Sequence, residues 1–317
     1  MSTLISLISY SFLIISPMMS YMANDWLILW VALEINLCSF CYICFSKNLK
    51  STNSMMKYFI IQILSSLMMV FFMVIKSEFN HQFNPLISIA MAIKLGLFPF
   101  HFWLISVGEG LSWINFLIFS TWQKIIPLMI YSNSPTLMNF FIISSSLFGA
   151  ILMFTSSSLR KILIFSSLPN MSFMLVPMEN YSYYWTMYLL IYSLILTSLS
   201  LTFNKFNINS ISSVQFLSKN NKSLLIYLIL SLSGFPPLLG FFNKMMVLYL
   251  ISCSTYFSMS CLIISTMISC FAYLRMAIPS ILHYSLAKNI NIYSIKMTLT
   301  LMLNITSTML LLMLINL

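Results

Sequence analysis

Charge is scarce in this sequence. Only 6% of its 317 residues are Asp, Glu, Lys or Arg, and 60% are hydrophobic. A soluble domain of average composition carries about 25% charged residues, so a sizeable soluble domain is excluded. Each membrane span needs about 20 apolar residues. The length therefore allows roughly ten to twelve transmembrane helices.

Histidine, cysteine and glycine-rich motifs are also scarce. The three histidines are too scattered to predict a metal site, and no phosphate loop, dinucleotide-binding fingerprint or nucleophile motif is present. Cys38, Cys41 and Cys44 have the C-x-x-C-x-x-C spacing of part of an iron–sulfur run. No fourth cysteine or proline follows, and buried cysteine behaves as a small hydrophobe. We therefore favour helix packing over metal ligation for this trio.

Hydropathy and turn residues predict eleven transmembrane helices. The predicted spans are 3–20, 25–45, 55–75, 85–105, 110–131, 136–156, 161–177, 182–203, 223–251, 257–276 and 297–316. The ninth is too long for one straight helix, and Gly234, Pro236 and Pro237 interrupt it. The predicted fold class is therefore all-α, a polytopic transmembrane helical bundle within a single domain.

The placement of the charges predicts the topology. Loops after even-numbered spans, together with the span ends that adjoin them, hold eleven cations and one acid, whereas loops after odd-numbered spans and their adjoining span ends hold one cation and three acids. Positive charge stays on the side from which a membrane protein is inserted. The N-terminus is therefore expected on that side and, with an odd number of spans, the C-terminus on the other. Topology accounts for the net charge of +10, and we expect no nucleic-acid partner.

Four charged residues lie well inside predicted spans, away from the span ends, namely Glu34, Lys94, Lys124 and Lys244. At a rise of 1.5 Å per helical residue, these four residues lie about 11–14 Å from the membrane face that carries the acidic loops after odd-numbered spans. This depth is near the middle of a hydrocarbon core about 30 Å thick. A charge at this depth costs at least ~2.5–3.5 kcal/mol and typically marks an ion pathway. Snorkelling places lysines near helix ends, so it does not explain the shared depth. We predict that the four form a functional site.

Two of these lysines lie beside predicted helix breaks. Residues 92–103 read AIKLGLFPFHFW, with Pro99 five residues after Lys94. Residues 234–244 read GFPPLLGFFNK and end at Lys244. Proline removes a backbone donor and tends to break a helix. Irregular backbone at membrane depth is tolerated only where protein or a watery cavity satisfies it.

The two breaks also predict an internal repeat. Each falls in the fourth span of a five-helix unit, approximately 1–132 and 136–279, followed by a final helix at 297–316. Because five is odd, the two units would have opposite orientations in the membrane. Paired, interrupted helices at matching positions of inverted repeats indicate a transporter's site. The match is imperfect, since the lysine precedes the break in one unit and follows it in the other.

Six stretches of this sequence resemble the NADH dehydrogenase subunit 2 family of animal mitochondrial complex I. They are WLILWVALEIN at 26–36, KYFIIQ at 57–62, KLGLFPFHFW at 94–103, TWQKIIP at 121–127, SSSLRKILIFSS at 156–167 and SLSGFPPLLGFFNK at 231–244. They occur in family order across most of the chain. The resemblance implies an antiporter-like fold of eleven helices in the mitochondrial inner membrane. It places the N-terminus on the matrix side and the C-terminus on the intermembrane-space side.

The resemblance also implies roles for the buried charges. By motif, Glu34 is the glutamate paired with Lys94, Lys124 is the central relay lysine, and Lys244 is the lysine of the second broken helix. The family moves protons across the membrane, driven by electron transfer from NADH to ubiquinone elsewhere in complex I. NADH, FMN, iron–sulfur clusters and ubiquinone would therefore serve the complex, with none bound by this chain. Expected partners are other membrane-arm subunits and phospholipids, with cardiolipin as one candidate.

The chemistry of such a path follows from the charges. A carboxylate beside a buried ammonium stabilises the charged form, so Glu34 would hold Lys94 protonated. If Glu34 moved to another partner, Lys94 would become a better donor toward Lys124 and Lys244 through water, with His101 as a weaker member of the path. The alternative is that each lysine pairs with a backbone carbonyl in a packed bundle. A histidine satisfied by carbonyls freed at the break is the equivalent alternative for His101.

Two departures from the family, and two other functions, stay open. Many relatives carry Pro-Glu shortly after FHFW where this chain has Ile105 and Ser106, and Glu109 is a candidate substitute. Relatives often carry a histidine where Pro169 and Asn170 stand, which puts a histidine relay there in doubt.

A stand-alone cation/proton antiporter of the related fold is the alternative function. A structural membrane scaffold, the third possibility, leaves the four aligned charges unexplained.

Overall fold

The described part of the chain is helical. The computed structural model describes residues 2–45, 49–79, 84–133, 136–180, 183–211, 213–214, 217, 219–236, 238–250 and 256–282. No β-strand occurs within these ranges, and the predicted all-α fold class is confirmed. The eleventh predicted span, 297–316, and Pro237 of the ninth lie outside the described residues.

Eight stretches of the described chain are long and apolar enough to cross a membrane. Seven are single helices: α1 (Ser2–Met22), α2 (Trp26–Cys44), α3 (Leu49–Phe79), α8 (Met138–Thr155), α9 (Leu159–Asn180), α10 (Tyr184–Lys205) and α13 (Tyr256–Leu282). The eighth, Trp113–Asn133, consists of α6 (Trp113–Ser120), a 3₁₀ turn η2 (Trp122–Lys124) and α7 (Ile125–Asn133). These eight coincide with eight of the predicted spans.

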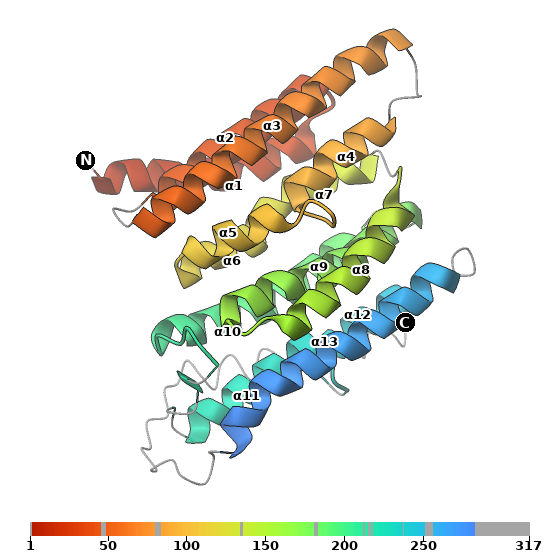
Figure 1. Cartoon of the computed structure of the whole chain (residues 1–317). Coiled ribbons are helices and arrows are strands. Elements are labelled where there is room, and N and C mark those ends of the chain that lie inside the picture. Colours follow the sequence, from red (N-terminus) through yellow and green to blue (C-terminus); the bar gives the residue numbers. More distant parts are fainter. Residues whose placement is uncertain are drawn as a thin grey trace. The chain divides into compact units, whose positions relative to one another are not determined.

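The fourth and ninth predicted spans are each split into two short helices. α4 (Asn84–Leu95) is followed by α5 (Phe102–Gly110), and α11 (Lys219–Ser233) is followed by α12 (Leu239–Leu250) (Figure 1). Both breaks begin at a glycine with positive φ, +68° at Gly96 and +80° at Gly234. This left-handed region is accessible to glycine without a Cβ clash, so the two glycines end their helices.

The same hydrogen-bond pattern closes both half-helices. Leu97 N donates to Ala92 O at 3.0 Å, and Phe235 N donates to Leu230 O at 3.3 Å. A bond of this span around a left-handed glycine is the Schellman motif, which satisfies carbonyls at a helix C-terminus. The two breaks therefore share their backbone chemistry as well as their glycine.

A third interruption lies in the fifth span, where the hydropathy pattern predicts one continuous helix. Thr121 is distorted from ideal helical geometry, with φ −120° and ψ −67°, and the 3₁₀ turn η2 follows it. Pro127 stands in the first turn of α7. Its ring lacks an N–H and would clash with the carbonyl four residues earlier in a regular helix. That carbonyl belongs to Gln123, so Pro127 contributes to the break beside Lys124.

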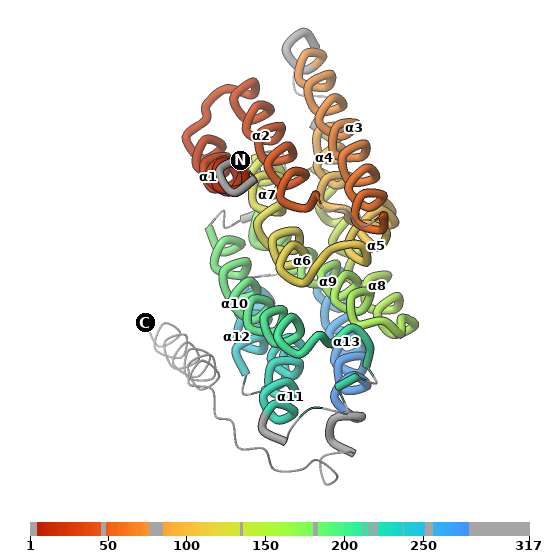
Figure 2. Tube along the Cα trace, turned by 90° about the vertical axis from the view of Figure 1, so that its left-hand side faces the viewer, coloured from red at the N-terminus to blue at the C-terminus, as the bar shows by residue number. Residues whose placement is uncertain are grey.

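The helices group into two compact units, a first comprising Met1–Ser145 and a second that begins at Ser146. In the first unit α2 packs against α1, α3 and α7, and α3 also packs against α4 and α5. In the second unit α9 packs against α10, α12 and α13, and α10 also lies beside α12 (Figure 2). The inverted relation of two five-helix units remains a prediction.

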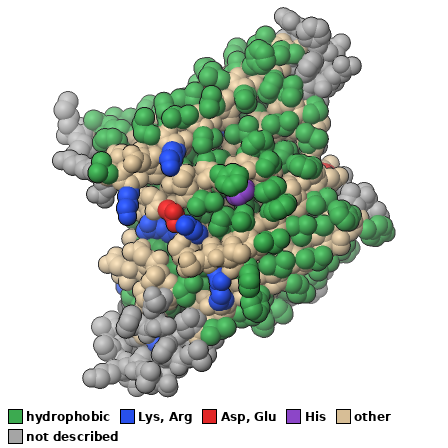
Figure 3. Space-filling model, in the orientation of Figure 1, with side chains coloured by type: hydrophobic (Ala, Val, Ile, Leu, Met, Phe, Trp, Pro, Cys, Tyr) green, Lys and Arg blue, Asp and Glu red, His purple; other side chains and the backbone are tan. Residues whose placement is uncertain are grey.

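Large apolar side chains remain exposed on the described chain. Hydrophobic side chains cover much of the face shown in Figure 3. On α1 alone, Leu7 is 67% exposed, Tyr21 73% and Met22 81%. Soluble monomers rarely expose apolar patches beyond a few hundred Å². This surface therefore suits lipid or the apolar surface of a neighbouring membrane protein.

Candidate functional site: buried lysines at helix breaks

All three predicted lysines are buried, and all three lie at or beside a helix interruption. Lys94 is in the last turn of α4, Lys124 ends the 3₁₀ turn η2, and Lys244 is in α12. Their exposed fractions are 5%, 5% and 8%. Lysine is almost never this buried in a protein without a partner or a function. The sequence indicates a helix break beside Lys94 and beside Lys244. The structure adds a break beside Lys124, so all three lysines share this feature.

The break after α4 leaves carbonyl groups that side chains of other elements satisfy. Gln62 Nε2 of α3 donates to Lys94 O at 3.3 Å, and Trp103 Nε1 of α5 donates to Ile93 O at 3.1 Å. The last carbonyls of a helix have no partner within the helix itself. These two donors therefore stabilise irregular backbone that would otherwise be costly at membrane depth.

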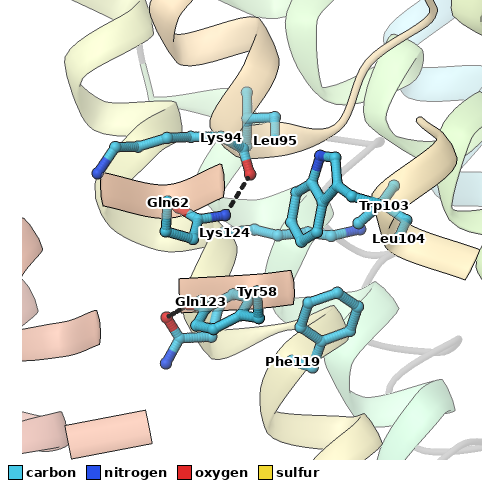
Figure 4. A pocket seen from close by; sticks show the side chains of 9 residues that line it. All are labelled: Tyr58, Gln62, Lys94, Leu95, Trp103, Leu104, Phe119, Gln123 and Lys124. Carbon is cyan, nitrogen blue, oxygen red and sulfur yellow. Dashed lines mark hydrogen bonds between the residues drawn. The ribbon is translucent and has the colours of Figure 1, made fainter. Parts of the chain in front are cut away.

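A cavity of about 10 Å³ lies next to the Lys94 and Lys124 positions, and we call it the first-unit cavity. Its polar lining includes Tyr58, Gln62 and Gln123, as well as the two lysines (Figure 4). A space of this size is about the minimum for one water molecule. Figure 4 shows the Lys94 and Lys124 side chains pointing in opposite directions. The two amines therefore do not face each other directly.

The Lys124 amine has no hydrogen-bond partner among the described residues, although it is buried. Its side chain extends toward Trp103 and Leu104 (Figure 4). An unpaired charge inside a protein carries a desolvation penalty of several kcal/mol. If the lysines served packing alone, each buried amine would be expected to donate a hydrogen bond to a backbone carbonyl. The Lys124 amine has no such acceptor in the described chain.

Glu34 of α2 is partly buried and faces α3. Its Oε1 accepts a hydrogen bond from Ser66 Oγ at 2.5 Å. Glu34 thus has a serine hydroxyl of α3 as a hydrogen-bond partner, and its pairing with Lys94 remains a prediction.

His101 is buried in an aromatic setting at the start of α5. Its ring stacks on Phe98 with centroids 5.3 Å apart and lies against Phe102 at 4.3 Å. Its Nδ1 atom has no hydrogen-bond partner among the described residues. His101 is not one of the residues that line the first-unit cavity. The structure therefore does not place it beside Lys124.

Lys244 is held differently from Lys124. Its Nζ donates to Ser233 O at 2.8 Å, and Ser233 is the last residue of α11. The amine also lies 5.9 Å from the centre of the Phe173 ring. The C-terminal carbonyls of a helix carry partial negative charge, so the broken end of α11 supplies the acceptor. This is the carbonyl pairing that the packing alternative expects of a buried lysine.

Polar side chains surround a second cavity, also of about 10 Å³, which we call the second-unit cavity. Tyr188 Oη donates to Asn170 Oδ1 at 2.9 Å, and Asn243 Nδ2 donates to Tyr188 O at 3.3 Å. Tyr192 also lines the cavity, and its hydroxyl is buried close to the Asn170 side chain. Lys244 lines the same cavity. Asn170 therefore contributes to a polar site near Lys244, a role that the sequence does not indicate.

The cysteine trio lies on α2 without forming a cluster of ligands. Cys38 is exposed, Cys41 is partly exposed and Cys44 is buried, and all three are free thiols. No group of three or more His, Cys, Asp or Glu side chains that could hold a metal ion occurs among the described residues.

Comparison with known proteins places this chain in a family. Residues 76–269 match the family described as NADH:quinone oxidoreductase/Mrp antiporter, TM. NADH-ubiquinone oxidoreductase chain 2 of Anopheles gambiae is 37% identical over 282 residues, which cover 84% of this chain and 82% of that protein. The chain belongs to the NADH-ubiquinone oxidoreductase chain 2 family. The matched residues 76–269 include Lys94, Lys124 and Lys244, while Glu34 precedes them.

Solved structures share the fold of this chain. A chain of respiratory complex I from Thermus thermophilus with bound aureothin has a TM-score of 0.76 at 16% identity, over 87% of this chain and 75% of that one. A chain of the Mrp complex from Dietzia sp. DQ12-45-1b has a TM-score of 0.70 at 14% identity, over 87% of this chain and 64% of that one. At these identities the likenesses show the fold alone.

Proposed function

We propose that this chain provides a proton-translocation path through Lys94, Lys124 and Lys244, with Glu34 as the charge partner of Lys94. As a member of the chain 2 family, it is a membrane subunit of the proton-pumping NADH:ubiquinone oxidoreductase. The observation that carries the proposal is the Lys124 amine, which is buried beside a cavity and has no partner among the described residues. Such an amine can exchange a proton with water that enters the cavity.

In the proposed mechanism Glu34 acts as the switch of the first unit. While Glu34 is paired with Lys94, its carboxylate favours the ammonium form of the lysine. In the structure Glu34 accepts a hydrogen bond from Ser66; when Glu34 is held there instead of at Lys94, that stabilisation is lost and Lys94 releases its proton more readily. Water in the first-unit cavity would carry the proton toward Lys124, because the two amines point in different directions.

Lys244 and the second-unit cavity would form the other part of the path. The amine has a fixed acceptor in Ser233 O, and Tyr192 offers a hydroxyl within the same cavity. Hydroxyl groups both donate and accept hydrogen bonds, so this side chain suits proton transfer through water. We keep His101 as a weaker candidate, since aromatic rings surround it rather than polar groups.

The surroundings of the chain are part of the proposal. NADH, FMN, the iron–sulfur clusters and ubiquinone would be bound by other subunits, and electron transfer there would drive the proton movement. The exposed apolar surface would contact other membrane-arm subunits and inner-membrane phospholipids, with cardiolipin at the basic loops. The N-terminus would lie on the matrix side and the C-terminus on the intermembrane-space side, as positive charge in the loops indicates.

A stand-alone cation/proton antiporter is the second candidate, because the fold is shared with a chain of an Mrp complex. The two functions differ in what the isolated chain should do. An antiporter reconstituted alone in vesicles would exchange cations for protons, whereas a complex I subunit would be inactive alone. Purification of the native chain within a large NADH-oxidising assembly supports the subunit. Cation exchange by the chain alone supports the antiporter.

Replacement of Lys244 by Met is expected to reduce proton pumping about threefold per NADH oxidised, since it removes one titratable group from the path. Methionine keeps the length of the buried stem, so assembly should be preserved. Proton uptake and NADH oxidation measured together in vesicles give the ratio. Lys205→Met is the matched control, because Lys205 is exposed at the end of α10. An unchanged ratio in assembled Lys244→Met complex would remove Lys244 from the path.

A further inference from the structure

The 3₁₀ turn that carries Lys124 is tied to three neighbouring helices through the residues just before the lysine. Trp122 Nε1 donates to Leu13 O of α1 at 2.7 Å. Gln123 is bonded to Asn36 of α2 and Tyr58 of α3. Residues 122 and 123 are thus anchored, whereas the Lys124 amine that follows is left without a partner in the described chain.

Asn36 and Gln123 form a reciprocal amide pair. Asn36 Nδ2 donates to Gln123 Oε1 at 2.9 Å, and Gln123 Nε2 donates back to Asn36 Oδ1 at 3.2 Å. Tyr58 Oη donates to the same Gln123 Oε1 at 3.0 Å (Figure 4). An amide oxygen has two lone pairs, so both acceptor positions of Gln123 are occupied. The pair fixes the direction of the Gln123 side chain and hence the position of the turn.

The pair also shares helix α2 with the proposed charge switch. Asn36 follows Glu34 by two residues on α2, and it is 3% exposed. Tyr58 and Ser66 lie on α3, so α2 and α3 each contribute one contact to Gln123 and one to the Glu34–Ser66 bond. A displacement of α2 against α3 would therefore act on both Glu34 and the turn that carries Lys124.

We propose that the Asn36–Gln123 amide pair, supported by Tyr58, positions Lys124 at the first-unit cavity and couples it to the helix of Glu34. This inference rests on the proposed function, because it assigns a role within the same proton path. Asn36, Gln123 and Tyr58 are positioning residues, since they act through the lysine. A role in packing alone would lower the stability of the complex and leave the number of protons pumped per NADH unchanged.

The first test is Asn36→Ala in the assembled complex. We expect about threefold fewer protons pumped per NADH oxidised, a loss typical of residues that couple two sites without contacting a ligand. Ser39→Ala is the matched control on α2, because the Ser39 hydroxyl donates to Asn36 O within its own helix. It should leave the ratio unchanged. An unchanged ratio in assembled Asn36→Ala complex would overturn the proposal.

A double-mutant cycle and a rescue separate positioning from packing. If the two amides act as one unit, Asn36→Ala combined with Gln123→Ala should pump no worse than either single variant. The exchanged pair, Asn36→Gln with Gln123→Asn, keeps two amides and should recover at least half of the lost ratio. Two results would count against the proposal. One is a double variant whose loss in protons pumped per NADH equals the product of the two single losses, and the other is an exchanged pair that recovers nothing. Tyr58→Phe removes one hydrogen bond and gives the same test with a smaller change if the alanine variants fail to assemble.

Lys124→Met distinguishes failure of this inference from failure of the proposed function. If Lys124→Met and Asn36→Ala both pump normally, the proton path through Lys124 is wrong, and the positioning role falls with it. If Lys124→Met loses pumping while Asn36→Ala does not, the path stands and only the positioning role is wrong. Loss in both, with the exchanged pair restored, supports the two together.

Discussion

Complex I that carries Lys124→Met should assemble and oxidise NADH but pump about tenfold fewer protons per NADH than the native complex, because a proton-transfer group of its path is lost. Methionine has nearly the length of the lysine stem and carries no charge. The substitution therefore removes the unpartnered amine without opening a large void. The loss should be greater than for Lys244→Met, whose amine already has a backbone acceptor.

The measurement is the proton-to-NADH ratio in vesicles, with the amount of assembled complex determined in parallel. Removal of an unpaired buried charge should leave stability unchanged or raise it, so low assembly is not expected. Lys57→Met is the matched control in the same unit, because Lys57 is exposed on α3. A native ratio in the assembled Lys124→Met complex would show that protons cross without this lysine.

The helix breaks at Gly96 and Gly234 were predictable because local chemistry determines them. Each glycine and the prolines that follow it mark a helix end in the sequence, and the structure closes both ends with the same hydrogen-bond motif. The burial of Lys94, Lys124 and Lys244 was predictable for a similar reason, since hydropathy sets depth and few charges compete. Both features depend on residues within about ten positions of each other.

The contacts of the site were not predictable in the same way. Asn36 and Gln123 are 87 positions apart, and their pairing depends on how α2 and the 3₁₀ turn are rotated toward each other. In a chain that is apolar on nearly every face, the hydrophobic pattern gives little indication of which face turns inward. The polar residues Tyr188 and Tyr192, four positions apart on α10, were missed for the same reason. A pair of tyrosines at that spacing was the one available signal.

The two units hold their lysines differently although their broken helices are capped alike. Lys94 precedes its break, and its proposed partner is the carboxylate of Glu34 on another helix. Lys244 follows its break and folds back onto the carbonyl of Ser233 at the end of α11. A carboxylate partner can move or change its protonation state, whereas a backbone carbonyl cannot. In the proposed path the first unit would therefore carry the switch, and the second a fixed acceptor.

Gly240→Ala is expected to have the largest effect on assembly. A Cβ atom on Gly240 would lie 1.8 Å from the main-chain oxygen of Ser231. The obstacle is backbone, so no side chain can turn away to relieve the clash, and α12 must move away from α11. Overpacking of a buried site costs about 1–3 kcal/mol and more where the backbone must shift. The shift would also separate Lys244 from Ser233 O, which lies on the α11 side of the break.

A loss of this size should lower the amount of assembled complex about fivefold or more, because 1–2 kcal/mol already changes the abundance of a protein several-fold. Native gel electrophoresis with NADH-dehydrogenase staining measures the assembled fraction, and thermal unfolding of the remainder measures its stability. Met245→Ala is the control on the same helix, since Met245 is exposed and its truncation leaves the contact between α11 and α12 intact. Native assembly and unchanged thermal stability in Gly240→Ala would show that the two half-helices are not in such close contact, and that the acceptor of Lys244 is set by something other than their packing.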